Sequence, residues 1–246
     1  MKALILRLDA PLMSFGGVII DQHGFTERFP GKSLLTGLLA NALGWRHGDF
    51  ERLQALQARL EYAARWDVPP ERLVDYHTVD LGQPKMREPG WTTRGEVEHR
   101  AGGPDARYGT HIRYRHHWAD GLMTVALALT GEGEPDLETV RQALTRPARP
   151  LFLGRKACLP ARPLLDPEPM RQGPDLLAIL RAVPRWDRHG RPRQDTGVEK
   201  MEACWPADLG IPEGTRGEIR RVYDLRDWPN QLPAGSRERA EGILGG

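Results

Sequence analysis

Two short segments combine a glycine with basic side chains, which suits phosphate binding. The first is Pro30-Gly31-Lys32-Ser33, which opens a stretch of leucines at helical spacing. A helix N-terminus presents free backbone N–H groups, so together with Lys32 it can hold an anion. A complete nucleotide-binding P-loop would also need a glycine at the position of Thr26, so an ATPase is not favoured.

The second segment is Gly154-Arg155-Lys156. Glycine permits a tight turn and a close approach of the backbone to a phosphate, and two adjacent cations neutralise its charge. A solvated turn is the alternative interpretation of so short a motif.

A third segment, Tyr114-Arg115-His116-His117-Trp118, combines aromatic rings with imidazoles. Adjacent residues of a strand point to opposite faces, and no HExxH motif or cysteine pair accompanies them, so we predict no metal site and no cofactor. Two interpretations stay open. The histidines act as general acid or base on RNA, or the segment is an edge that stacks on bases or packs against a neighbour.

The composition of the 246 residues bounds the class of protein. No run approaches the roughly 18–20 apolar residues of a membrane helix, and two cysteines, Cys158 and Cys204, are too few for a disulfide scaffold or a zinc ribbon. We therefore expect a soluble, cytoplasmic protein. The net charge is only +2, yet just five of the 35 basic residues are lysine, and arginine suits phosphate recognition and stacking on bases. The alternative cause of this excess of arginine over lysine is codon bias in a GC-rich genome.

Hydrophobic patterns predict the elements that position these segments. Strands are predicted at 2–8, 61–67, 72–80, 123–130 and 157–165, and helices at 30–44, 50–60 and 135–144. Residues 82–113 form an excursion rich in glycine, proline and arginine that shows no core pattern. When this excursion is set aside, the order of the other elements predicts an α+β fold. Residues 1–165 would form a ferredoxin-like, RRM-like βαββαβ domain, and residues 166–246 a small β-rich C-terminal domain with strands around 197–205 and 218–225.

This topology brings the two glycine-containing segments together. The last strand of such a sheet lies antiparallel beside the first, so the 154–156 turn should adjoin the end of the first strand and the start of the helix at Pro30. Both candidate anion sites are thus predicted at one edge of the sheet. The composition of the 82–113 excursion predicts an extended arm that grips RNA or inserts into an adjacent subunit. The alternative is a surface loop without a function of its own.

Four segments in this order resemble one family. They are Arg28–Gly44, Asp75-Tyr-His-Thr-Val79, Ala119-Asp120 before Met123-Thr-Val-Ala-Leu127, and Leu151-Phe-Leu-Gly-Arg-Lys-Ala-Cys158. They are similar to those of the CasD family of the RAMP superfamily, the subunits of type I-E CRISPR Cascade complexes that cap the 5′ end of the guide RNA. The similarity covers residues 1 to about 165.

The resemblance implies a glycine-rich loop at Leu153–Lys156 and a thumb hairpin inserted at about 77–118. It also implies a non-catalytic subunit that binds the 5′ handle of CRISPR RNA in antiviral defence. Its partners would be the backbone and large subunits and, indirectly, target DNA, with no membrane. We expect RNA contacts from Gln22, His23, Phe25, Arg28, Lys32, Ser33, Tyr108, Arg113, Tyr114, Arg115, Gly154, Arg155 and Lys156.

Two other functions remain open. One is a metal-independent endoribonuclease that processes CRISPR repeat RNA, with His116 or His117 as base and Lys85 or Lys156 stabilising the phosphorane. The other is a structural bridge whose thumb binds protein only.

Overall fold

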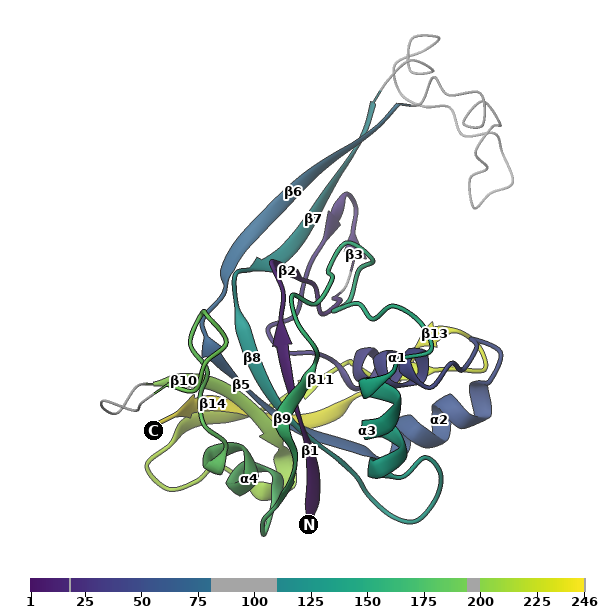
Figure 1. The fold of residues 1–246 in the computed structure, drawn as a ribbon. Helices are drawn as coiled ribbons and strands as arrows, with labels where there is room; N and C mark the ends of the chain where they lie inside the picture. The colour runs from purple at the N-terminus through teal and green to yellow at the C-terminus, as the bar shows by residue number, and fades with distance from the viewer. Residues whose placement is uncertain (18, 81–109, 194–199, 246) are drawn as a thin grey trace.

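The computed structural model describes residues 1–17, 19–80, 110–193 and 200–245 (Figure 1). Tyr108, Lys85 and most of the predicted excursion lie outside these ranges, so the structure does not test the predictions made for them. The described chain has a mixed α+β fold.

A seven-stranded antiparallel sheet forms the body of the molecule, and β1 lies near one edge of it. In their order across the sheet the strands are β11 (Arg216–Val222), β14 (Arg237–Leu244), β10 (Met201–Pro206), β5 (Leu60–Val68), β8 (Leu122–Leu129), β1 (Lys2–Asp9) and β9 (Leu165–Gln172). Strands from both sides of the predicted boundary at 165/166 share this sheet, and that boundary would separate β9 from its partner β1.

Helices cover both faces of the sheet, which is why β1 is apolar on both sides. Leu4, Leu6 and Leu8 pack under α1 (Lys32–Ala42), α2 (Phe50–Arg59) and α3 (Leu137–Thr145). Ala3 and Ile5 face α4 (Leu176–Ala182) on the other side. Figure 1 shows α4 and the three other helices on opposite sides of the sheet. In the described part of the chain, no helix has the length and apolar character needed to cross a membrane.

A long hairpin projects from this body (Figure 1). Its strands are β6 (Glu71–Asp80) and β7 (Thr110–Ala119), which pair antiparallel from Glu71 opposite Ala119 to Asp80 opposite Thr110. The base of β7 also pairs with β2 (Leu12–Met13) and, in parallel, with β4 (His23–Gly24), and β3 (Ile19–Ile20) completes this second sheet. The hairpin occupies the place of the predicted thumb, and its ladder begins before residue 77.

The prediction of a strand at 157–165 is wrong. Residues 151–164 are irregular, and the strand that pairs with β1 on the side away from β8 is β9, which begins at Leu165. Pro160 and Pro163 lack backbone N–H groups and interrupt a ladder. The segment still runs beside the end of β1, because Ala161 N–H donates to the Asp9 carbonyl and Arg7 N–H to the Leu164 carbonyl.

The remaining predicted elements are confirmed within a few residues, and the C-terminal part is rich in strands. Its smaller elements are η3 (Ala207–Leu209), β12 (Arg226–Asp227) and β13 (Leu232–Pro233).

Candidate nucleic-acid interface

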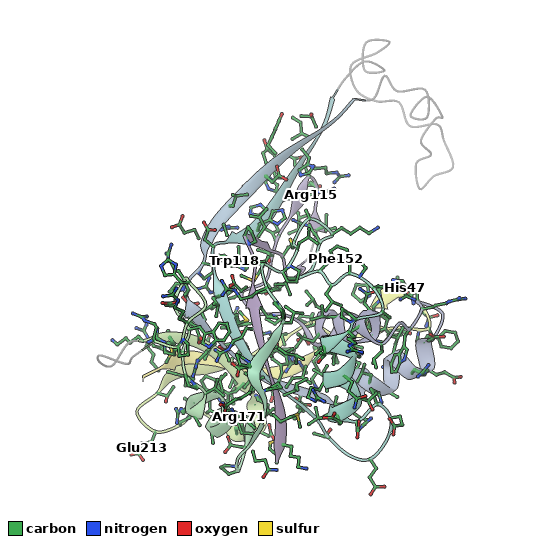
Figure 2. The ribbon with its side chains drawn as sticks, viewed as in Figure 1. His47, Arg115, Trp118, Phe152, Arg171 and Glu213 are labelled. Atoms are coloured by element: carbon green, nitrogen blue, oxygen red, sulfur yellow. The ribbon has the colours of Figure 1, made fainter. Side chains whose placement is uncertain are left out.

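A cleft of about 870 Å³ opens along the exposed side of α1. Its walls come from residues 14–17, the loop around 149–156, residues 45–47 after α1, and Arg226 and Trp228 near the C-terminus. Figure 2 shows Phe152 and His47, two of the lining residues, on the α1 side of the molecule. Ser33 lines the same cleft as Gly154, Arg155 and Lys156, so residues of both predicted glycine-containing segments border one cleft.

The lining of the cleft carries charge of one sign. Among the described residues that form it there is no aspartate or glutamate, whereas the cationic ones are Arg46, Arg149, Arg155, Lys156 and Arg226. Such a surface raises the local concentration of a polyanion. For a chain with nearly equal numbers of acidic and basic residues, this separation of charge is the strongest feature of the cleft.

The cations of the cleft keep their charge uncompensated. Arg149 donates to the carbonyl oxygens of Gly44 (2.8 Å) and Trp45 (2.6 Å), and Arg226 donates to the backbone and side-chain oxygens of Gln231. These acceptors are neutral. The side chains of Arg46 and Lys156 are exposed, and within the described ranges no carboxylate pairs with either.

Gly154 is required by the protein backbone itself. Its φ is +104°, and a Cβ added there would lie 1.6 Å from the carbonyl oxygen of Ser14. The close approach is fixed by the Ser14 N–H, which donates to the Leu153 carbonyl at 3.0 Å. The sequence predicted a close approach to phosphate at this glycine. The approach in the structure is to the 14–17 loop, and it joins two walls of the cleft.

Arg155 joins the glycine-rich loop to the base of the hairpin. Its guanidinium donates to the Gly24 carbonyl of β4 (2.9 Å) and to the His116 carbonyl of β7 (3.0 Å). It also lies 3.3 Å from Nε2 of His117. Burial lowers the pKa of this guanidinium, and Arg115 adds to the effect. The predicted phosphate contact is therefore not its principal role in the structure, which is to position the cleft wall against the hairpin.

The N-terminus of α1 is already occupied by a carboxylate. Asp224 accepts from the backbone N–H of Lys32 on its side chain (3.1 Å) and from that of Ser33 on its carbonyl (3.0 Å). The Lys32 side chain is buried and pairs with Glu61. The anion site predicted here is thus filled from within the chain, and the Lys32 ammonium already has Glu61 as its partner.

Arg28 also has a partner within the chain. Its guanidinium lies over the rings of Trp118 (4.7 Å to the centroid) and Trp66 (5.1 Å). The same group pairs with Glu202. This arrangement fixes the base of the hairpin to the sheet and leaves Arg28 little capacity for the predicted phosphate contact.

Aromatic rings gather where β4 meets the hairpin. The His23 ring stacks on Tyr114 (centroids 4.8 Å apart, planes at 11°) and on Phe25 (5.7 Å, 11°). Tyr76 of β6 lies 5.5 Å from Tyr114 and is exposed. The predicted base-stacking residues His23, Phe25 and Tyr114 are therefore together, and Phe25 lines the cleft.

Three further predicted residues lie at the edge of this cluster. Gln22 is exposed, and its carbonyl accepts from the Tyr114 N–H (2.8 Å). The Arg113 guanidinium donates to the Asp21 carbonyl (2.7 Å). Arg115 is exposed on the hairpin, where Figure 2 shows it.

His116 and His117 are buried and face protein groups. His117 lies between Arg155 and the Cys158 sulfur, with Nδ1 3.6 Å from Sγ. Nδ1 of His116 is 3.1 Å from Arg72, and its Nε2 is 3.4 Å from the His23 ring. Burial, reinforced by Arg72 for His116 and by Arg155 for His117, lowers the pKa of both imidazoles. Neither ring is presented to a substrate, so no observation supports the endoribonuclease alternative.

Comparison with known proteins places the chain in a family. The family model described as CRISPR-associated protein (Cas_Cas5) matches residues 3–240. The chain belongs to this family. A curated relative, the CRISPR system Cascade subunit CasD of Escherichia coli (strain K12), is 34% identical over 169 residues, which are 65% of this chain and 68% of the relative. The resemblance to the CasD family predicted from four segments is confirmed.

Two solved structures match this member of the CRISPR-associated family over almost its whole length. A chain from a CRISPR RNA-guided surveillance complex superposes with a TM-score of 0.65 and 27% identity, over 99% of this chain and 89% of the other. A structure described as a Cas protein superposes with a TM-score of 0.57 at 23% identity, covering 99% and 93%, and supports the fold alone.

Sequence reasoning missed one end of the cleft in this family member. The residues that form this end are Arg46 and Arg149, outside helices and strands, and Arg226 in the short strand β12, and their local sequences show no motif. Only the position of Arg46-His47 a few residues beyond the end of α1 was a signal, because a helix end presents its next residues to solvent. No pattern in the sequence places Arg226 beside them.

Proposed function

We propose that this chain is a non-catalytic subunit of a CRISPR Cascade surveillance complex and binds the 5′ handle of the guide RNA in the cation-lined cleft. The observation that carries the proposal is the cleft lining, which among the described residues has five cationic side chains and no carboxylate. The family and the printed names of its relatives supply the biological setting.

The shape of the site supports single-stranded RNA as the ligand. Specific recognition of RNA relies on unstacked bases that lie on aromatic or guanidinium planes. The ring cluster of His23, Phe25, Tyr114 and Tyr76 lies at the hairpin end of the cleft, and Phe25 belongs to both. Phosphates would follow the cations along α1 while bases stack beside the hairpin.

The fold supports the same proposal. We infer that β1, α1, β5, β8, α3 and β9 form the predicted ferredoxin-like unit, because the sheet order β5-β8-β1-β9 with antiparallel neighbours and both helices on one face is what that unit requires. The projecting hairpin is then the thumb, and it offers a surface to the backbone and large subunits of the complex. Target DNA would be met indirectly, through the guide RNA.

The experiment is a salt titration of guide RNA binding by the full chain. In the double variant Arg46→Ala/Lys156→Ala the slope of log affinity against log salt should become shallower by about 1.4, which is about 0.7 for each phosphate contact to a single strand. The matched control is Arg216→Ala/Arg221→Ala, which removes two exposed arginines of β11 outside the cleft. Equal slopes for the two double variants would contradict the proposal.

A further inference from the structure

A second basic surface lies on the opposite face of the main sheet. We call residues 185–193, Arg185-Trp-Asp-Arg-His-Gly-Arg-Pro-Arg193, the arginine turn. It follows α4, and its contacts to the sheet are with Arg7 and Asp67, which point to the α4 side of β1 and β5. The cleft lies on the α1 side, and none of residues 185–193 lines it. The two surfaces are therefore separate.

The arginine turn is anchored by a buried ionic network. The Trp186 side chain is buried with Val68 and Leu122, and the Arg7 guanidinium lies 4.5 Å from the centre of its ring. The backbone N–H of Trp186 donates to the Asp67 carboxylate at 2.9 Å. That carboxylate also pairs with Arg7 and Arg65, so the turn is attached to groups that hold the sheet together.

Within the turn, the only carboxylate faces inward. One oxygen of Asp187 accepts from the backbone N–H groups of His189 (2.8 Å) and Arg191 (3.0 Å). Donation by the Arg191 N–H is the largest cause of the lowered pKa of this carboxyl. Gly190 has φ +70°, and a Cβ there would collide with Arg162, which donates to the His189 carbonyl at 3.1 Å. The backbone is thus fixed on both sides of Arg188.

This rigid backbone presents cations to solvent. Arg188 and Arg191 are exposed, and within the described part of the chain neither forms an ion pair with a carboxylate. The exposed large hydrophobic side chains of the protein include none from residues 176–193. Protein interfaces have an apolar core, whereas phosphate backbones are bound by arginine without one.

The geometry points to the arginine turn as a second nucleic-acid site, in which Arg188 and Arg191 contact the sugar-phosphate backbone of a nucleic-acid strand. Guanidinium groups bind phosphate oxygens in a bidentate manner, and a fixed turn places two of them without a large loss of conformational entropy. Contacts of guanidinium groups with phosphate carry no sequence information, so we expect binding at this site to be independent of sequence. This proposal does not depend on what the cleft binds.

The test compares two probes and three variants of the full chain. Each variant carries Arg46→Ala/Lys156→Ala, so that the cleft contributes little. The probes are a 20-nucleotide oligouridine RNA and a mixed-sequence 20-base-pair DNA duplex. Adding Arg188→Ala/Arg191→Ala should make the salt slope shallower by about 1.4 for the RNA or about 1.8 for the duplex, and lower the affinity at 0.1 M salt. Which probe responds identifies the source of the phosphates.

The other two variants make the outcome decisive. Arg188→Lys/Arg191→Lys should restore most of the slope, since it keeps the charges, and Arg216→Ala/Arg221→Ala should leave it unchanged. If the Arg188→Ala/Arg191→Ala slope equals that of the Arg216→Ala/Arg221→Ala control for both probes, the proposal is overturned. The same holds if nucleic-acid binding is unchanged but co-purification with protein subunits is lost, because the turn would then bind an acidic protein surface.

Discussion

Arginines under α4 and arginines along α1 illustrate two opposite uses of one side chain. On the α4 face Arg7 and Arg65 are buried and share Asp67, which also accepts from Thr124, while Arg7 pairs in addition with Asp166. In the cleft the guanidinium groups of Arg149 and Arg226 donate to neutral oxygens, and that of Arg46 pairs with no carboxylate in the described part of the chain. The first group is neutralised and holds strands together. The second keeps its charge for a ligand.

The comparison shows that acidic partners, rather than the arginine itself, separate structural from binding cations. Two cations expected to bind RNA belong with the structural group, because Arg28 pairs with Glu202 and Lys32 pairs with Glu61. Arg155 lines the cleft and donates to two backbone carbonyls, so it holds the cleft wall by hydrogen bonds rather than by an ion pair. Exposed Lys156 remains with the binding group.

The largest effect is expected from Asp67→Ala, which leaves Arg7 and Arg65 buried without their shared carboxylate. Removing one partner of a buried ion pair costs about 3–5 kcal/mol of the free energy of unfolding. Urea denaturation measures the loss, and Asp208→Ala, at an exposed position, should change stability by less than about 0.5 kcal/mol. Should the alanine variant not fold, Asp67→Asn should show a smaller loss in the same direction. A loss below about 1 kcal/mol in both would refute the structural assignment.

Gly154→Ala tests whether the wall of the cleft depends on the approach to Ser14. The new Cβ meets a backbone oxygen and the residue keeps a positive φ, so we expect about 1–3 kcal/mol less stability than in the control Gly16→Ala. Gly16 has φ +81° but no atom within 4 Å of the added Cβ, so it isolates the cost of backbone conformation. Equal losses in the two variants would show that the contact with Ser14 does not matter.

Lys32→Met removes a cation from the structural group, and Arg46→Ala removes one from the binding group. Arg46→Ala should reduce the salt slope of guide RNA binding by about 0.7, whereas Lys32→Met should leave the slope unchanged and lower only stability. Fluorescence anisotropy at four salt concentrations measures both. The reverse pattern would return Lys32 to the RNA site and break the division.

The smallest effect concerns the imidazoles beside Arg155. Because the pKa values of His116 and His117 are lowered in the folded state, the unfolded chain binds more protons below about pH 6.5. Their contribution to stability is therefore complete above that pH and is lost as the pH falls. The thermal midpoint should decrease between pH 7 and pH 5, and less so in His116→Gln/His117→Gln. An identical decrease in that variant would assign the effect to other groups.

Local regularity explains which features were predictable. The continuous apolar run of β1 and the leucine spacing of α1 are fixed by neighbours in the chain, so their patterns appear in the sequence. The error at 157–165 arose because the apolar residues around Pro160 and Pro163 resemble a strand, whereas the missing N–H groups of the prolines prevent a ladder.

The site was less predictable because its decisive contacts are distant in sequence. The predicted strands and helices brought the glycine-rich loop and the start of α1 to one edge of the sheet, and residues of both line one cleft. They gave no indication that Asp224, 192 residues beyond Lys32, would occupy the helix N-terminus. Nor could they show that Arg226, in the C-terminal part of the chain, lines the same cleft as Arg46.

Photocrosslinking of the assembled complex tests the central proposal most directly. Guide RNA carrying 4-thiouridine at successive positions of its 5′ handle would be irradiated in the complex, and the modified peptides of this chain identified by mass spectrometry. We predict adducts in the residues that line the cleft, at 14–17, 33–41, 45–47 and 152–156. Adducts confined to other surfaces, such as the β11 edge at Arg216–Val222, would contradict the account.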